Sequence, residues 1–473
     1  MRRSLSSFTR DSSRRPWTPG TNGLVRGEVA LVTETTAEDL QKFAGKLKGK
    51  WILTQAAPDV AAYWTAPASR ETIEELERME LAANPGPEFG VANPNAAGRG
   101  QGGGRGGFGG GGFDRNAWFK AEGVAGLLST APRGHGVYTI GGGDRQAEPT
   151  AGLPRIAIPA EQYGRMARMV AKNLTVTIEA DIKNTYTPNP PMFNVVGEIP
   201  GTDKADEVVM LGAHFDSWHA STGATDNVAG SAAMMEAMRI LKQSGVTLRR
   251  TVRIGLWTGE EQGLIGSRDY VKAHFGGCND PANTGRGGAQ RGAAPAAPAA
   301  AQPGAAPAGQ TAGAPPAPAP QRGGGGRGGC QTGYTFKPEH AKFAGYFNID
   351  NGTGAIRGVY LQQNDAVAPI FREWIEPFRS IGMTAITVRN TGGTDHQSFD
   401  AIGLPGFQFI QDEIEYGSMT HHTNLDSYER LQPGDMMKNA TIAASFAFLA
   451  ANRDERLPRK PAPVAGAGRG TGQ

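Results

Sequence analysis

The sequence predicts an α/β protein whose main domain is a mostly parallel sheet covered by helices on both faces. From residue 190 onwards, short apolar runs typical of buried strands alternate with segments of helical periodicity. Such alternation implies parallel strands joined by crossover helices. Two internal Gly-rich or Pro-rich stretches interrupt the pattern, and we expect both to loop away from the folded parts.

The main domain is predicted to span residues 190–455. Its expected strands are 207–213, 251–258, 342–350, 384–390 and 404–410. Its expected helices are 227–243, 265–275, 366–382 and 434–453. Because each helix follows a strand after a short loop, the carboxyl ends of several strands should meet at one edge of the sheet.

A smaller α/β domain is predicted over residues 20–185. Its expected strands are 27–34, 50–55 and 174–182, with 119–130 running from a helix end into a strand. Its expected helices are 37–49, 70–82 and 158–173.

The composition reflects two low-complexity insertions. Hydrophobic residues make up only 38% of the chain, because 68 Gly and 32 Pro are concentrated in a few stretches. These stretches cannot form a packed core, so we expect disordered insertions at about 86–114 and 278–332. We expect residues 456–473 to form a flexible tail.

Charge and hydropathy argue against nucleic-acid and membrane partners. The net charge is +3, from 48 Lys and Arg against 45 Asp and Glu, and no apolar run could cross a bilayer. Arg-Gly-Gly units in the first insertion resemble RNA-binding tails, and an RNA-associated protein is kept as an alternative. The N-terminus lacks the apolar stretch of a signal peptide, which indicates a cytoplasmic protein or a start downstream of the natural one.

The two cysteines, Cys278 and Cys330, flank the second insertion, 330 − 278 = 52 positions apart. Two readings stay open, a pair of free thiols or a disulfide that closes the loop. A bridge would contribute about 4 kcal/mol by the chain-entropy relation and would imply an oxidising compartment.

Acids and histidines gather where the predicted strands end. His214 and Asp216 follow the first strand of the main domain, Glu260 and Glu261 follow the second, and Asp350 ends the third. Asp226 precedes a helix and His422 lies in a loop before the last helix, so both can reach the same edge. His nitrogen and carboxylate oxygen without Cys form a normal ligand set for catalytic zinc.

Five such ligands exceed what one tetrahedral zinc takes, whereas two ions that share a carboxylate would use all five. Each residue also has an ordinary interpretation, since an acid after a strand can be a helix N-cap and a lone His can be packed. From the residues alone, the pattern indicates a metal hydrolase.

Five phrases carry a more specific resemblance. They are GAHFDSWHASTGATDNVAGSAAMMEAMRIL, LWTGEEQGLIGSRDY, FNIDNGTG, GGTDHQSFDAIGLPGF and HHTNLDSYERL, in this order. Together they resemble metallopeptidase family 28, the two-zinc exopeptidases, and HFDSW resembles its carboxypeptidase Q branch. The phrase GKLKGKWILT resembles the protease-associated domain that this branch carries.

The resemblance implies the zinc exopeptidase fold, two zinc ions and a role for each ligand. Asp226 would bridge the ions, His214 and Asp350 would complete one site, and Glu261 and His422 the other. His422 fits the family spacing of His-Thr with an Asp four positions after the His, here Asp426, and His421 does not. The resemblance also implies a cis peptide bond between Asp226 and Asn227.

Catalysis would follow from that arrangement. Glu260 would be the general base toward a metal-bridged water, and Asp216 would orient the His214 imidazole. Tyr416, His396 and His421 are weaker candidates for oxyanion or substrate contacts. The implied function is hydrolysis of dipeptides or short peptides, in a periplasmic or secreted protein.

Several alternatives remain open. A glutaminyl cyclase-like enzyme would use one zinc on the same scaffold. A non-catalytic binding protein would have the peptidase scaffold without hydrolysing peptides. Nothing ranks Glu413, Glu415 and Arg389 as holders of a substrate's free end, so aminopeptidase, carboxypeptidase and dipeptidase are not separated. A homodimer is an alternative to a monomer.

Overall fold

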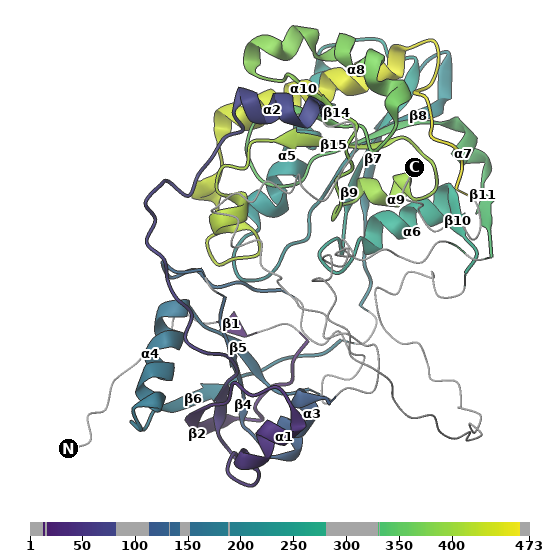
Figure 1. The fold of residues 1–473 in the computed structure, drawn as a ribbon. Coiled ribbons are helices and arrows are strands. Elements are labelled where there is room, and N and C mark those ends of the chain that lie inside the picture. The colour runs from purple at the N-terminus through teal and green to yellow at the C-terminus, as the bar shows by residue number, and fades with distance from the viewer. Residues whose placement is uncertain are drawn as a thin grey trace, which may run out of the picture.

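The chain forms two main sheets, each with its own helices (Figure 1). The structure is a computed structural model, and it describes residues 13–14, 17–81, 113–131, 133–141, 152–187, 190–280, 330 and 332–463. The predicted insertions and the end of the predicted tail therefore lie largely outside the described residues. Within the described part of the chain, no helix combines the length and apolar character needed to cross a membrane.

The larger sheet has seven strands, most of them paired in parallel. Their spatial order is β14 (Ala385–Thr387), β13 (Ile356–Tyr360), β15 (Gly406–Gln411), β12 (Phe343–Asn348), β8 (Lys204–His214), β9 (Arg250–Trp257) and β7 (Val195–Ile199). Four of the neighbouring pairs are parallel, whereas β7–β9 and β13–β15 are antiparallel. The predicted fold class is confirmed.

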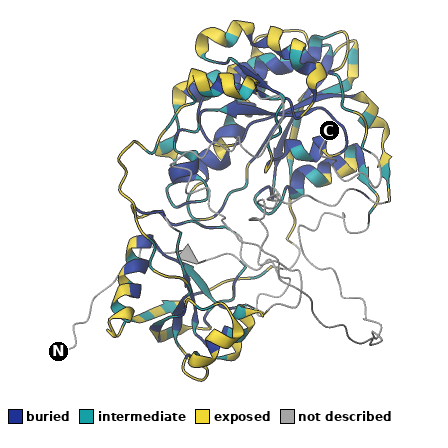
Figure 2. Ribbon diagram, viewed as in Figure 1, coloured by how far each residue is buried: buried dark blue, intermediate teal, exposed yellow. Residues whose placement is uncertain are grey.

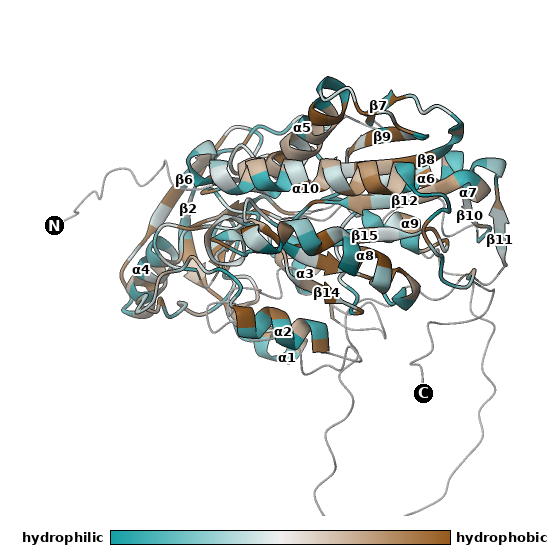
Figure 3. Ribbon diagram, turned by 90° about the horizontal axis from the view of Figure 1, so that it is seen from above, coloured by the Kyte–Doolittle hydropathy of each residue, from teal (hydrophilic) through white to brown (hydrophobic). Residues whose placement is uncertain are grey.

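Helices cover both faces of this sheet. One face carries α5 (Ala229–Gln243), α8 (Ala368–Ile375) and α10 (Pro433–Asn452); the other carries α6 (Ile265–His274) and α9 (His396–Asp400). Along β8, Val209 and Leu211 face the first layer and Met210 the second, the alternation that a strand dictates. Figure 2 shows the strands buried between the layers, and Figure 3 shows α10 lying over β8, β9 and β12.

Each strand predicted for the larger sheet is present, but two of its strands were not predicted. The edge strand β7 is half exposed, with Val195 53% accessible, so it lacks the apolar run of a buried strand. Strand β13 contains Arg357 and Gly358, which interrupt the apolar run that would indicate a buried strand. The helix predicted over 366–382 divides into α8 and a 3-10 segment, Glu376–Ile381, because Pro377 has no N–H for the helical ladder.

The smaller sheet has the strand order β1 (Ser13–Arg14), β5 (Arg155–Ala157), β4 (Gly126–Ser129), β3 (Trp51–Leu53), β2 (Leu24–Leu31) and β6 (Thr177–Asp181). The helices α1 (Ala37–Leu40), α3 (Arg115–Ala121) and α4 (Ala160–Ala171) accompany it. Trp51 is fully buried in the core between β3 and α4. The boundaries 20–185 of a protease-associated-like domain stay a prediction.

One helix of that segment lies with the other sheet. Helix α2 (Ile73–Leu81) was predicted within the smaller domain, but its Leu76 packs against Ala385 of β14 and Ile410 of β15. Its amphipathic pattern indicated a helix and could not indicate which sheet the helix covers. The chain thus crosses to the larger sheet and returns.

The buried carboxylate of Asp412 holds the residues just before α2 against the larger sheet. Asp412 lies 2.6 Å from Arg70 and 2.7 Å from Arg357, and the backbone N–H of Glu71 donates to it at 3.0 Å. The Asp412 side chain is almost completely buried. It therefore joins residues that are more than 340 positions apart in the sequence.

We predict that Asp412→Ala destabilises the protein by about 3–5 kcal/mol, because it leaves Arg357 without its buried counter-charge. Urea unfolding followed by circular dichroism measures the change. The matched control is Glu376→Ala, which removes an exposed pair with Arg379 and should cost below about 1 kcal/mol. Equal stabilities of the two variants would contradict the prediction.

The two cysteines form a disulfide. Cys278 ends β10 (Gly276–Cys278), which pairs antiparallel with β11 (Tyr334–Phe336), and its Cα lies 5.7 Å from that of Cys330. Of the two readings left open by the sequence, the structure has the bridged one. The bridge joins the two ends of the chain segment that contains the second insertion.

Removing the bridge with Cys278→Ala and Cys330→Ala together should lower the free energy of unfolding by up to about 4 kcal/mol, since the loop spans 52 positions. Thermal unfolding with and without reductant measures this, and the double variant should no longer respond to reductant. Equal stability of wild type and variant would refute a stabilising bridge.

Candidate metal centre

Three adjacent strands deliver the predicted residues to one edge of the larger sheet. Strands β12, β8 and β9 are neighbours, and β8 is parallel to both of the others. His214 is the last residue of β8, Glu260 follows β9, and Asp350 follows β12. All three side chains are buried. Parallel order alone brings them together, as the sequence pattern predicted.

Asp226 comes to the same place from the loop before α5, where its backbone is fixed by a second carboxylate. The backbone N–H groups of Thr225 and Asp226 donate to Asp426 at 2.6 and 3.1 Å. The Asn227 side chain donates to the Ile349 carbonyl at 2.9 Å. The peptide bond between Asp226 and Asn227 is cis, as the family resemblance implied.

The two carboxylate oxygens of Asp226 face different histidines. Oδ1 lies 3.4 Å from Nε2 of His214, and Oδ2 lies 3.3 Å from Nε2 of His422. On the first side, His214 Nε2 is 3.6 Å from Oδ1 of Asp350. On the second side, His422 Nε2 is 2.8 Å from Oε2 of Glu261. Two groups of ligand atoms therefore share one carboxylate.

His421 also lies close to the second group. Its Nε2 is 4.0 Å from Oδ2 of Asp226, and its ring centroid is 3.8 Å from that of His422. Asp226, His421 and His422 have ligand atoms within 4.8 Å of one another, as do His214, Asp226 and Asp350. The distances favour His422 as the closer partner of Asp226 and Glu261.

The donor set fits metal ions. Oδ2 of Asp226 is buried and accepts no hydrogen bond, although a buried carboxylate oxygen normally has a partner. Among the described residues, the basic side chains within 4 Å of the Asp226 carboxylate are all histidines, whose ring nitrogens can also bind a metal ion. Nitrogen and oxygen donors without thiolate suit catalytic zinc.

The pKa values of two acids reflect burial among like charges. Burial raises the pKa of Glu260 well above its usual range. Burial and then the neighbouring Asp226 charge raise the pKa of Glu261 to about 7. Bound cations would oppose these shifts by favouring the carboxylate forms. A buried acid with a raised pKa is a normal candidate for proton transfer near neutral pH.

Asp216 contacts both strand ends. Nδ1 of His214 lies 3.0 Å from the Asp216 main-chain carbonyl and 3.7 Å from its carboxylate. The carboxylate instead accepts the backbone N–H groups of Glu260 and Glu261, at 3.0 and 3.4 Å. The orienting group on the imidazole is thus the carbonyl, and the carboxylate fixes the loop that carries both glutamates.

The weaker candidates lie in different surroundings. The Tyr416 ring centroid lies 4.8 Å from that of His421, and burial together with the Asp226 charge raises the Tyr416 pKa well above its usual range. His396 is buried in α9, with Nε2 at 3.1 Å from the Thr391 carbonyl. Tyr416 and His421 adjoin the centre, whereas the His396 ring contacts the backbone of the loop before α9.

The N-terminal region contacts the centre, which sequence reasoning missed. The Arg133 guanidinium donates to the His421 carbonyl at 3.3 Å, and the Ile140 N–H donates to the His422 carbonyl at 2.8 Å. The Trp218 ring lies 6.1 Å from the His422 ring and packs edge-on against Trp17. No periodicity or motif signals these contacts, because they depend on how distant segments dock.

The fold and the arrangement of these residues resemble those of known metallopeptidases, as comparison with known proteins indicates. Residues 194–284 match the family model described as peptidase family M28, so the predicted resemblance to that family is confirmed. The crystal structure of a peptidase M28 precursor from Shewanella amazonensis aligns with a TM-score of 0.59 at 20% identity. The alignment covers 97% of this chain and 81% of that one, and it establishes the fold.

Two curated proteins illustrate the sequence similarity. Carboxypeptidase Q of Mus musculus is 25% identical over 307 residues, which cover 65% of this chain and 52% of that protein. Leucine aminopeptidase 2 of Trichophyton equinum is 38% identical over 136 residues, covering 28% of this chain and 25% of that protein. The chain thus spans about half the length of the carboxypeptidase Q relatives that it matches.

Proposed function

We propose that this protein is a zinc-dependent exopeptidase that hydrolyses dipeptides or short peptides. The observation that carries the proposal is the position of Asp226, whose two oxygens face His214 and His422 separately. This arrangement suits two zinc ions that share Asp226, with Asp350 completing one site and Glu261 the other. When bound, the zinc ions would supply Lewis acidity and lower the pKa of a water molecule.

Glu260 is the proposed general base. Its carboxylate is buried, lies 4.0 Å from Nε2 of His214, and is held outside the two ligand groups. A carboxylate there can accept a proton from the attacking water and pass it to the leaving amine. Its backbone is fixed through Asp216, so the carboxylate is positioned before the substrate binds.

Short substrates are favoured by the N-terminal region. Main-chain and side-chain hydrogen bonds from Ile140 and Arg133 reach the carbonyls of the two adjacent histidines. This region therefore lies beside the proposed ligand His422, and we expect it to restrict the space that a long peptide would occupy. We retain the interpretation of residues 20–185 as a protease-associated-like domain and of 190–455 as the catalytic domain.

The proposed enzyme could recognise either the free amine or the free carboxylate of its substrate. Glu415 is engaged in an ion pair with Arg430 at 2.6 Å, which makes it a poor holder for a free amine. The similar proteins carry the names of a carboxypeptidase and an aminopeptidase. Both activities are therefore included in the proposal.

A panel of peptides tests the function. The substrates are dipeptides, amino-blocked peptides and carboxy-blocked peptides, each assayed with and without a chelator. We expect chelator-sensitive hydrolysis of at least one short peptide, and the blocked substrate that fails identifies the required free end. Absence of hydrolysis across the panel in protein loaded with zinc would support a binding protein on this scaffold.

A periplasmic or secreted location is proposed with the function. The disulfide between Cys278 and Cys330 is a bond that persists in oxidising compartments. Thiol titration of the denatured, unreduced protein purified from its native source should find no free thiol. Two free thiols would contradict both the bridge and the location.

A further inference from the structure

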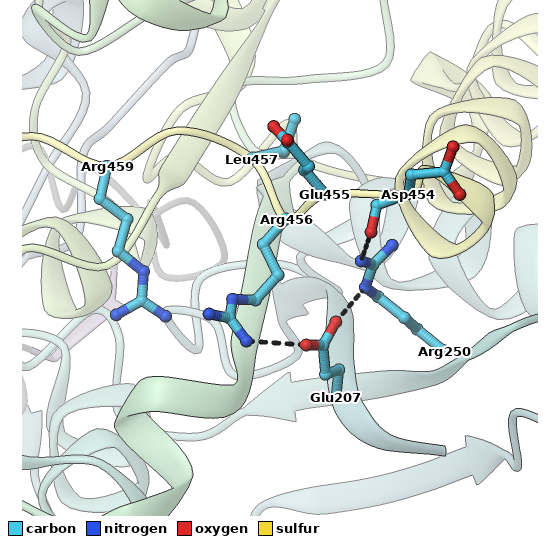
Figure 4. A pocket seen from close by; sticks show the side chains of 7 residues that line it. All are labelled: Glu207, Arg250, Asp454, Glu455, Arg456, Leu457 and Arg459. Atoms are coloured by element: carbon cyan, nitrogen blue, oxygen red, sulfur yellow. Dashed lines mark hydrogen bonds and ion pairs between the residues drawn. The ribbon is translucent and has the colours of Figure 1, made fainter. Parts of the chain in front are cut away.

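A second site lies at the opposite edge of the larger sheet from the metal centre. It is a cavity of about 410 Å³ lined by Glu207, Arg250, Arg456, Arg459 and the chain around Asp454 (Figure 4). Glu207 lies near the start of β8 and His214 at its end. Seven residues of strand separate them by roughly 23 Å, so the cavity is independent of the metal centre.

The floor of the cavity is buried and polar. The Arg250 guanidinium is 1% exposed and donates to the carbonyls of Ala450 and Arg453 at the end of α10. It also contacts Glu207 at 2.6 Å. Cationic groups are favourable at a helix C-terminus, so this arginine is committed to the fold.

Two further guanidinium groups face the cavity above this floor. Arg456 lies 2.7 Å from Glu207, which it shares with Arg250, and its side chain is 41% exposed. Arg459 donates to the carbonyls of His340 and Phe343, at 2.7 and 2.6 Å. Within the part of the chain that the structure describes, no carboxylate contacts Arg459.

The positive charges of this pair are not balanced inside the cavity. Figure 4 shows the guanidinium groups of Arg456 and Arg459 side by side on one side of the chain, with the carboxylates of Asp454 and Glu455 on the other. The Asp454 carboxylate pairs with Arg249 at 2.6 Å. Arg250 and Arg456 therefore share one lining carboxylate, that of Glu207, and Arg459 contacts none among the described residues.

We infer that this cavity binds a small molecule carrying a phosphate or carboxylate group, with Arg456 and Arg459 as the groups that recognise the oxyanion. Planar guanidinium forks match the geometry of both anions. The anion would supply the counter-charge that Arg459 lacks among the described residues. The inference does not depend on the peptidase proposal, since no residue is shared between the two sites.

Equilibrium dialysis at constant ionic strength tests the site, with inorganic phosphate as one probe and succinate as the other. We expect one bound probe per chain, weakened at least tenfold by Arg459→Gln and by Arg456→Gln. Arg456 contacts only Glu207 among the described partners, so Arg456→Gln should leave the fold intact if Arg459→Gln does not. Arg239→Gln, which alters an exposed arginine on α5, should bind like wild type.

Binding at the metal centre is separated by Asp226→Ala. The proposed site should keep its probe in that variant, whether or not the peptidase proposal holds. Binding of phosphate alone would assign a phosphate ligand, binding of succinate alone a carboxylate ligand, and both support the site. No binding of either probe, binding unchanged in both arginine variants, or binding lost only in Asp226→Ala would overturn the inference.

Discussion

Glu260→Gln should lose hydrolytic activity by about 10²- to 10⁴-fold while keeping its zinc content, because the amide cannot accept the proton of the attacking water. Glutamine has nearly the same size, and Glu260 lies outside the two groups of ligand atoms that share Asp226. The loss should fall on kcat more than on KM, since the proton is transferred in the chemical step. Steady-state kinetics and elemental analysis of the same preparation measure both properties.

Glu236→Gln is the matched control for this prediction. Glu236 lies on α5, contacts Arg239 and is exposed, so the same chemical change should leave kcat within about twofold. If Glu260→Gln behaves like this control, Glu260 has no role in proton transfer. If it loses zinc as well as activity, Glu260 belongs to the metal ligands instead.

Asp226→Ala should lose both zinc ions and all measurable hydrolysis. The carboxylate lies between His214 and His422, and each of its oxygens serves one group of ligand atoms. Its removal takes a ligand from both sites at once, whereas loss of Asp350 should empty chiefly the site that contains His214. Elemental analysis after dialysis against zinc-free buffer distinguishes the two variants.

Asp350→Ala is therefore the informative comparison. We expect it to retain more zinc than Asp226→Ala, because His422 and Glu261 remain in contact with Asp226. Equal zinc content in the two variants would remove the distinction between a shared and an unshared carboxylate. Full zinc content in Asp226→Ala would contradict its position between the ions.

The larger sheet was predictable because its central strands are buried on both faces. Buried strands such as β8 and β9 form apolar runs that stand out in a sequence, and the residues after them follow from parallel order. The edge strand β7 lacks this signal, because none of its residues is buried. Helix α2 was recognised as a helix, but its place on β14 depends on Asp412, a residue far along the chain.

The sequence indicated which residues form the centre, but it did not indicate how they contact one another. Strand ends and family spacing indicated His214, Asp226 and His422. The family spacing also included Asp426, but it did not indicate that Asp426 accepts backbone hydrogen bonds beside Asp226 or that the two Asp226 oxygens face different histidines. The same holds for Asp216, whose carbonyl and carboxylate contact different partners.

The docking of the N-terminal region lies beyond local reasoning altogether. Ile140 reaches His422 through its backbone N–H, and a backbone group carries no residue signature. Trp17 and Trp218 meet across 201 positions of sequence, and neither is part of a periodic pattern. Contacts of this kind place the N-terminal region beside the centre.

The number of zinc ions per wild-type chain tests the central claim most directly. Protein purified without added metal, dialysed and measured by elemental analysis should contain two zinc ions per chain, because two groups of ligand atoms share Asp226. One zinc ion per chain, unchanged after incubation with excess zinc and dialysis, would contradict the shared carboxylate and favour a single-zinc enzyme of the glutaminyl cyclase type.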